Sequence, residues 1–408
     1  MPLTTCERLA DRSPRGKSSP IQVNRTRSRQ KRWPLAAAVG AWLLASAQAE
    51  MPRIWLTHQS SDPSRIVVNW ETEMPAASVV HFGRSASLGQ TAGSQEKTTL
   101  HQVEIPTPDK DGLYHYAVGD GKEMSAQAVF KGYPSDELRV AVVGDWGYAM
   151  DRDLTALQKD DVHLLITAGD NVPSLHEKGI EGMKAFSALI DSQRELFRTT
   201  PFMPILGNHD KEAHSRGPKP PAEAVYDVDA KDYRTFFALP GDEWKWTFDI
   251  PGFDVRFFAL DLEHIQDFGT TWQTCHAFGE DSEQFRWYKD TLAGTKAGFV
   301  FTVMNEKQTA LQGRTKGLWH EQFKKTSALI TGFGYFADRA ELDGGLPYFN
   351  TCLKGNGDAY KDPRSKFFAS QDNYLLLRFR KGEKHMTVQF NNLHGEVMDT
   401  LEIARRPE

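Results

Sequence analysis

The 408-residue sequence is poor in cysteine, with only Cys6, Cys275 and Cys352. So few cysteines allow at most one internal disulfide. Long apolar runs are also missing: the run at 35–45 has about eleven residues, whereas a membrane-spanning helix needs about 20. We therefore expect no stable membrane anchor. No internal repeat or low-complexity tract is present. A composition of 39% hydrophobic and 25% charged residues is that of an ordinary globular protein, and a length of 408 residues suggests about two domains.

Residues 1–49 have the pattern of a secretory signal peptide. Five basic residues precede the apolar run, and Ala47-Gln48-Ala49 follows it with the small residues typical of a cleavage site. No twin-arginine pair is present, which favours the general secretory route. We expect cleavage before Glu50 and a secreted or periplasmic protein, with a translation start nearer Trp33 as an open alternative. The basic residues are Arg25, Arg27, Arg29, Lys31 and Arg32.

The charge balance argues against nucleic acid as a partner. The whole chain carries a net charge of −5. Residues 1–49 hold nine Lys and Arg against two Asp and Glu, so removing their +7 leaves −12 on residues 50–408. An acidic protein gains little from contact with phosphate backbones. Cleavage also removes Cys6, so Cys275 and Cys352 either pair or remain two free thiols, and both alternatives stay open.

The chain after residue 49 divides into two patterns. Short apolar or alternating runs separated by turn residues fill 50–133 and predict a small antiparallel β-sandwich. Residues 132–136 read as a linker. From 137 to 406, apolar strands alternate with helical segments at 181–197 and 281–292, which predicts a layered α/β domain. The strands expected there are 139–143, 163–167, 255–260, 299–303, 373–379 and 386–390.

Three motifs, each after an apolar strand, are suited to holding hard cations. The motifs are Gly144-Asp145-Trp146-Gly147, Gly169-Asp170-Asn171 and Gly207-Asn208-His209-Asp210. Carboxylate and amide oxygens at the carboxyl ends of strands converge where open α/β sheets bind ligands. Glycine allows the sharp backbone turn that each motif needs.

These motifs resemble those of the calcineurin-like metallophosphoesterases, and in particular of the purple acid phosphatases. The resemblance implies an α/β/β/α domain over 137–406, and residues 50–133 resemble the fibronectin-like domain that precedes many purple acid phosphatases. It implies that Asp145 binds a first metal ion and Asp170 bridges two. It also implies that Asn208 binds the second ion and that His209 is the catalytic proton donor or a phosphate contact. The ions would be Fe, Zn or Mn, and they would activate water and neutralise phosphoryl charge.

Four positions depart from the family pattern. Pro173 stands in place of a tyrosine, Asn305 in place of a histidine, and Phe333 and Tyr335 in place of two further histidines. A second metal site without its imidazoles should be empty, so we expect one metal ion rather than two, or none. Tyr335 is a candidate oxygen ligand of a single remaining ion with Asp145 and Asp170. The alternative is that Tyr335 only packs against Phe333.

Four other side chains are weaker candidates. His163 is expected in the core, and His214 and His320 on the surface. Glu306, beside Asn305, is a possible stand-in carboxylate.

Two functions follow from this pattern. The first is weakened metal-assisted hydrolysis of phosphate esters, with His209 assisting the leaving group. The second is a catalytically inactive pseudo-phosphatase that serves as a binding or structural module. Substrate choice and oligomeric state stay open, because loops of unknown geometry determine them.

Overall fold

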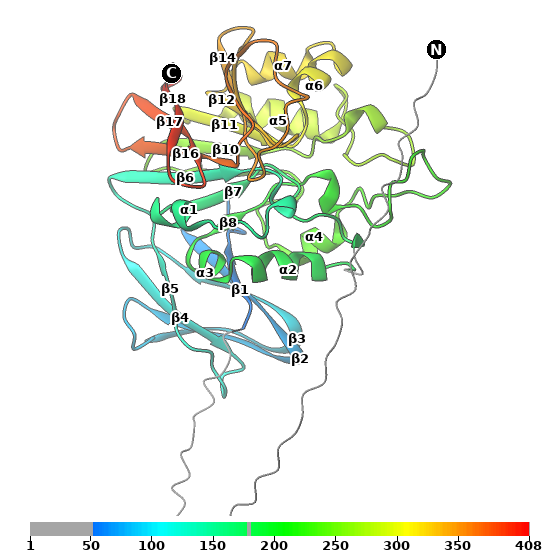
Figure 1. Cartoon of the computed structure of the whole chain (residues 1–408). Helices are drawn as coiled ribbons and strands as arrows, with labels where there is room; N and C mark the ends of the chain where they lie inside the picture. The colour runs from blue at the N-terminus through cyan, green and yellow to red at the C-terminus, as the bar shows by residue number, and fades with distance from the viewer. Residues whose placement is uncertain (1–51, 178–180, 408) are drawn as a thin grey trace, which may run out of the picture. The chain divides into compact units, whose positions relative to one another are not determined.

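The computed structural model describes residues 52–177 and 181–407. The predicted signal peptide, residues 1–49, lies outside the described residues. The described chain forms one N-terminal sheet followed by two larger sheets with helices (Figure 1). No helix in the described residues combines the length and the apolar character that a transmembrane segment requires.

The N-terminal region is antiparallel β-structure, as predicted. Its five strands form one hydrogen-bonded sheet, in which β2 pairs with β1 through its first part and with β4 through its last part. Side chains from both parts of β2, among them Val68 and Val80, belong to one buried apolar cluster. The resemblance to a fibronectin-like domain and the boundary at 133 stay predictions. The strands are β1 (Ile54–Thr57), β2 (Arg65–Gly83), β3 (Gln90–Pro106), β4 (Leu113–Gly119) and β5 (Ala128–Lys131).

The remainder of the chain contains two mixed sheets. In the six-stranded sheet, β6, β7 and β8 are parallel neighbours. Its order is β18 (Val397–Ala404), β17 (His385–Asn392), β16 (Asn373–Arg380), β6 (Glu137–Val143), β7 (Leu164–Thr167) and β8 (Phe202–Met203). In the seven-stranded sheet, β10, β11, β12 and β14 are parallel neighbours. Its order is β15 (Ser365–Ala369), β13 (Ala337–Leu342), β14 (Leu346–Asn350), β12 (Ala328–Thr331), β11 (Phe299–Met304), β10 (Val255–Ala259) and β9 (Trp246–Ile250).

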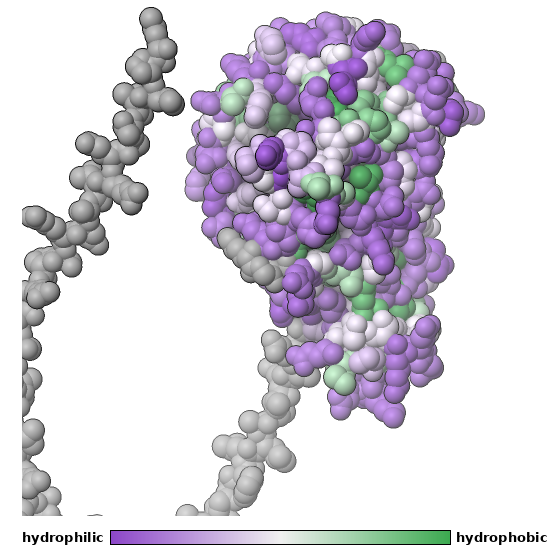
Figure 2. Space-filling view, turned by 90° about the vertical axis from the view of Figure 1, so that its right-hand side faces the viewer, coloured by the Kyte–Doolittle hydropathy of each residue, from purple (hydrophilic) through white to green (hydrophobic). Residues whose placement is uncertain are grey.

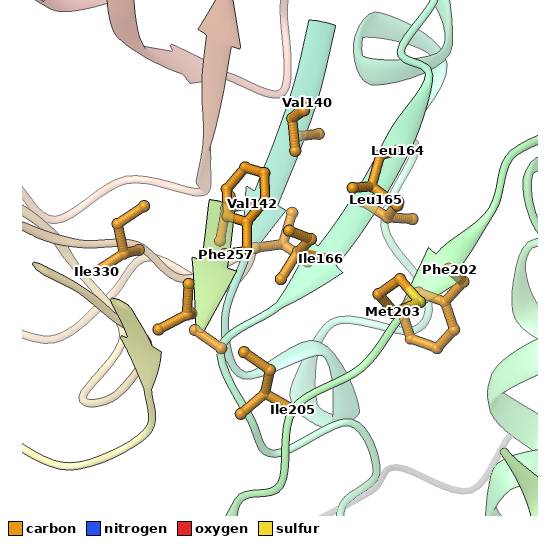
Figure 3. Packing of buried hydrophobic residues seen from close by; sticks show 14 of the residues in the cluster. Val140, Val142, Leu164, Leu165, Ile166, Phe202, Met203, Ile205, Phe257 and Ile330 are labelled. Atoms are coloured by element: carbon orange, nitrogen blue, oxygen red, sulfur yellow. The ribbon is translucent and has the colours of Figure 1, made fainter. Parts of the chain in front are cut away.

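The two sheets pack face to face over a shared apolar core. Val142 and Ile166 of the six-stranded sheet lie near Phe257 and Ile330 of the seven-stranded sheet (Figure 3). Successive residues of a strand point to opposite faces, so Phe258 belongs instead to a second cluster on the outer face.

Helices cover the outer faces of both sheets, which confirms the predicted α/β/β/α layers. Figure 1 shows α2–α4 and α5–α7 on opposite sides of the sheets. The first group shares the core of the six-stranded sheet, and the second group forms the outer cluster of the seven-stranded sheet. The helices are α1 (Thr155–Lys159), α2 (Lys184–Ser192), α3 (Arg194–Thr199), α4 (Lys231–Phe236), α5 (Glu283–Gly294), α6 (Gln308–Arg314) and α7 (Leu318–Phe323).

Two details differ from the sequence prediction. The single helix expected at 181–197 is divided, because Gln193 has a non-helical backbone (φ −144°, ψ 49°) between α2 and α3. His320 was expected on the surface but is 6% exposed, since it lies in α7 beside Trp319 with Nε2 near the backbone oxygen of Asp343. His163 is buried, as predicted.

The N-terminal sheet and the α/β region lie in one compact unit. The ring of Trp55 stacks on Phe236 with centroids 4.3 Å apart, and His58 packs against Phe248. Most of the face in Figure 2 is hydrophilic, with only small apolar patches, which is normal for a soluble fold.

Candidate functional site

The carboxyl ends of the parallel strands of both sheets meet around one open pocket of about 420 Å³. The six-stranded sheet contributes the segments after β6, β7 and β8. The seven-stranded sheet contributes the segments after β10, β11 and β12. Every predicted metal or catalytic residue lines this pocket: Asp145, Asp170, Asn208, His209 and Tyr335. Convergent polar groups in a cleft at strand ends are the usual setting of a ligand site.

The two aspartates stand on matching turns. Asp145 and Asp170 both have left-handed backbones, with φ of 52° and 53°, so the polypeptide turns sharply after each of the two strands. The turns are joined because the N–H of Gly147 donates to the backbone oxygen of Asp170 at 2.9 Å. A Cβ on Gly207 would lie 2.2 Å from Oδ1 of Asp170, so this motif needs glycine for close approach.

Asp145 is a buried carboxylate with one unsatisfied oxygen. It is 2% exposed, and its Oδ2 accepts a hydrogen bond from the thiol of Cys352 at 3.2 Å. Its Oδ1 has no hydrogen-bond partner. Burial and the nearby charge of Asp170 raise the pKa of Asp145 well above its usual range. An orphaned, buried oxygen beside a second carboxylate calls for a proton or a cation.

His209 lies at the pocket wall next to Asp170. Its backbone N–H donates to Oδ1 of Asp170 at 3.2 Å. Its imidazole pairs with the hydroxyl of Tyr148 (Nε2 to oxygen 2.6 Å) and with Glu212 (Nδ1 to oxygen 3.3 Å). Burial opposes protonation, but the charges of Asp170 and Glu212 outweigh it and raise the pKa of His209 to about 9. The arrangement is that of a protonated imidazole held in place.

A buried polar scaffold supports the turn that carries Asn208 and His209. Asp210 accepts hydrogen bonds from the backbone N–H of Asn171, the side-chain amide of Asn171 and the N–H of Gly207, at 2.8–2.9 Å. Burial and the charge of Asp170 raise the pKa of Asp210 to about 7. Neither Asp210 nor Asn171 was assigned a role from the sequence, although both lie inside the quoted motifs.

Asn305 lines the pocket, and its amide nitrogen is engaged in hydrogen bonds. Its side-chain nitrogen donates to the backbone oxygen of Ala168 at 2.9 Å and to that of Gly332. The amide is therefore used to join two loops. Glu306, the possible stand-in carboxylate, is similarly engaged, because its two oxygens accept from the backbone N–H groups of Ile265 and Lys307, each at 2.8 Å.

The two aromatic substitutions lie in the pocket but do not pair with each other as suggested. Tyr335 packs edge-on against Tyr148 with centroids 5.4 Å apart. Phe333 packs against Phe336 and Tyr360. Burial and the charges of Asp145 and Asp170 raise the pKa of Tyr335 above its usual range. Tyr335 therefore sits where an oxygen ligand could act, with its ring held by Tyr148.

The remaining candidates add no ligand. Pro173 carries no coordinating side-chain group, and His214 is exposed. Cys275 and Cys352 are buried free thiols, so the disulfide alternative is not realised. Cys352 instead lies against Asp145, a placement that its position in the sequence did not indicate.

The donor set suits one hard cation better than two. Asp145 and Asp170, with the orphaned Oδ1 of Asp145, are oxygen donors of the kind that hard cations prefer. A second ion fits poorly, because Phe333 has no donor atom and Asn305 offers only a neutral amide oxygen where the family has an imidazole. Among the described residues, no group of three or more His, Cys, Asp and Glu side chains is arranged to hold a metal ion.

Sequence reasoning also missed a buried ionic network behind the pocket. Lys211 follows the third motif directly, and its Nζ lies 2.5 Å from Asp261 and 2.9 Å from Glu263. The Oδ2 of Asp261 pairs with Nδ1 of His276 at 2.5 Å. An isolated lysine after a motif carries no sequence signal of burial, because its partners are about 50 residues further along the chain.

Comparisons with known proteins agree with this geometry. Residues 138–307 match the family model described as calcineurin-like phosphoesterase. The sequence is 22% identical over 253 residues to acid phosphatase type 7 of Mus musculus, a match that covers 57% of this chain and 52% of the relative. The chain thus spans about half the length of that relative.

Two solved structures have a similar fold. A purple acid phosphatase from seeds of yellow lupin (Lupinus luteus) superposes with a TM-score of 0.66 at 14% identity, over 87% of this chain and 75% of the lupin chain. A structure described as PhoD superposes with a TM-score of 0.63 at 11% identity, over 88% of this chain and 91% of that one. Together with the three motifs at the pocket, these matches show that residues 138–307 carry a calcineurin-like phosphoesterase domain and that the chain is similar to the purple acid phosphatases.

Proposed function

We propose that this protein binds phosphate esters in the pocket and hydrolyses them only weakly, outside the cytoplasm. One observation carries the proposal: the half of the site built on the six-stranded sheet is kept, and the half built on the seven-stranded sheet has lost its histidines. Asp145, Asp170 and His209 converge on the pocket, whereas Asn305 offers only a neutral amide oxygen and Phe333 no coordinating atom. The basic and apolar segments of residues 1–49 support the location.

The chain's own residues divide the work of hydrolysis. His209 is placed to give a proton to the leaving oxygen, because Tyr148 and Glu212 hold its imidazole at the pocket wall. Asp145 and Asp170 would hold a single cation of Fe, Zn or Mn, with Tyr335 as a further oxygen donor. Such a cation supplies charge neutralisation on the phosphoryl group.

The second candidate function is phosphate-ester binding without hydrolysis. The replacement of two family histidines by Asn305 and Phe333 favours it, because a second ion would lose both imidazole ligands. The two functions share the pocket and differ in whether turnover depends on Asp170.

Turnover of p-nitrophenyl phosphate distinguishes the two functions. Wild-type protein is expected to show slow turnover that needs added Mn, Zn or Fe. Asp170→Asn should reduce this turnover at least about tenfold, because it removes one of the two carboxylates that would hold the cation. Asp290→Asn, an exposed site on α5, is the matched control and should leave turnover unchanged. Equal rates for wild type and Asp170→Asn would sink the hydrolase proposal and leave binding without hydrolysis.

A further inference from the structure

The pocket is also the place where the two sheets meet at their ends. Backbone from each sheet comes very close here, since a Cβ on Gly332 would lie 2.7 Å from the Cα of Gly144. Gly144 follows β6 of the six-stranded sheet, and Gly332 follows β12 of the seven-stranded sheet. The N–H of Leu353 donates to the backbone oxygen of Gly144 at 2.9 Å, which also crosses between the sheets. Loops without regular pairing need such links to hold one conformation.

Asn305 makes a link between the sheets at the base of the pocket. It follows β11 of the seven-stranded sheet and is 4% exposed. Its side-chain nitrogen donates to Ala168, which follows β7 of the six-stranded sheet, and to Gly332. The three strand ends are thus joined through one amide group. The fit is tight, because a Cβ on Gly169 would lie 2.7 Å from the Asn305 amide nitrogen.

Cys352 makes a second link between the two sheets, close to the link made by Asn305. It follows β14 of the seven-stranded sheet and is fully buried. Its Sγ lies 3.2 Å from Oδ2 of Asp145, which follows β6 of the six-stranded sheet, and 3.2 Å from the backbone oxygen of Phe333. A thiol is a weak donor, but in a buried site it still satisfies an oxygen that would otherwise be unpaired.

We propose that Asn305 and Cys352 are positioning residues that join the two sheets by hydrogen bonds, so that the pocket keeps its shape without a metal ion between them. In a two-ion centre, ligands from both sheets would share the ions and connect the same loops. Here the seven-stranded sheet has no imidazole at Asn305 or Phe333, and the amide nitrogen and the thiol make the connection instead. A single cation would take both of its carboxylates, Asp145 and Asp170, from the six-stranded side and only the hydroxyl of Tyr335 from the other, so it would not replace these links.

Hydrogen exchange measured by peptide mass spectrometry tests the proposal, because it reports local opening of the two loops. The segments to follow are 144–149 and 168–172. Wild-type protein is expected to exchange equally in EDTA and in added Zn or Mn. Asn305→Asp keeps the shape of the side chain but replaces both N–H donors with an acceptor, so 168–172 should exchange at least about tenfold faster in EDTA. Cys352→Ala should do the same for 144–149, and Cys352→Ser, which keeps a donor, should restore most of the protection.

Asn350→Asp is the matched control. Asn350 is also buried, and its amide donates to the backbone oxygens of Phe333 and Phe336 and lies 4.0 Å from Sγ of Cys352, so its hydrogen bonds stay within the seven-stranded side. Because it contacts Cys352, it is a control for Asn305 alone, and this variant should leave 168–172 unchanged. Two results would overturn the proposal: EDTA accelerating exchange of both segments in wild-type protein, with Zn or Mn restoring it, or Asn305→Asp exchanging like wild type. The comparison of EDTA with added Zn or Mn uses wild-type protein alone, so it tests the proposal even if a variant fails to fold.

Discussion

Replacing Lys211 with methionine is expected to lower the free energy of unfolding by about 3–5 kcal/mol, measured by chemical denaturation at neutral pH. The ammonium group of Lys211 is fully buried and lies 2.5 Å from Asp261, 2.9 Å from Glu263 and 3.0 Å from the backbone oxygen of Thr274. Methionine has a similar volume but no charge, so two buried carboxylates would lose the cation that they share. The loss would also release the turn that carries His209.

Lys245→Met is the matched control. Lys245 is also buried, at 2% exposure, but its carboxylate partners Asp242 and Glu283 are mostly exposed and can be solvated when the lysine is lost. We expect a loss of about 1 kcal/mol or less for this variant. A Lys211→Met protein within about 1 kcal/mol of wild type would show that the network contributes little.

The second large effect is a loss of stability in acid that depends on His58. This residue is buried where the N-terminal sheet meets β9, with Nδ1 2.6 Å from the backbone oxygen of Arg65 and its ring against Phe248. Burial lowers the pKa of His58 from 6.5 to about 4. Between pH 6.5 and about 4, the unfolded state therefore binds a proton at His58 that the folded state does not bind. The stabilisation is complete above pH 6.5 and is lost as the pH falls from 6.5 to about 4.

Denaturation curves at two pH values measure this effect. Between pH 7 and pH 5, wild-type protein should lose about 2 kcal/mol through His58 alone, on top of other titrating groups. His58→Gln removes the titration, so its stability should change less over the same interval by about that amount. His81→Gln, on the half-exposed His81 of β2, is a suitable control and should follow the wild-type slope. Equal pH slopes for wild type and His58→Gln would exclude His58 as the acid-sensitive group.

The layered fold could be predicted because its strands are strongly apolar and end in recognisable motifs. Segments such as 139–143 and 163–167 are buried on both faces, and the residues that follow them need glycine and accept left-handed backbones. The convergence of Asp145, Asp170 and His209 follows from the same pattern, because the carboxyl ends of parallel neighbours lie at one edge.

The rest of the site could not be read from the sequence, because it depends on contacts between distant segments. Cys352 lies 207 residues from Asp145, and its role appears only when β6 and β14 are brought together. Likewise, the sequence marks Asn305 as a lost histidine but does not show that its amide joins Ala168 to Gly332. The prediction that His320 lies on the surface was wrong, because neighbouring segments cover one face of α7 and bury His320.

The central claim is that the site holds at most one metal ion, bound by Asp145 and Asp170 of the six-stranded sheet with Tyr335 as a further oxygen donor. Metal content of the purified protein, measured by elemental analysis after loading with Fe, Mn or Zn and removal of excess, tests it most directly. We expect at most one ion per chain, lost in Asp145→Asn and Asp170→Asn and unchanged in the control Asp290→Asn. Two stoichiometric ions per wild-type chain would contradict the account and would mean that other side chains replace the missing ligands.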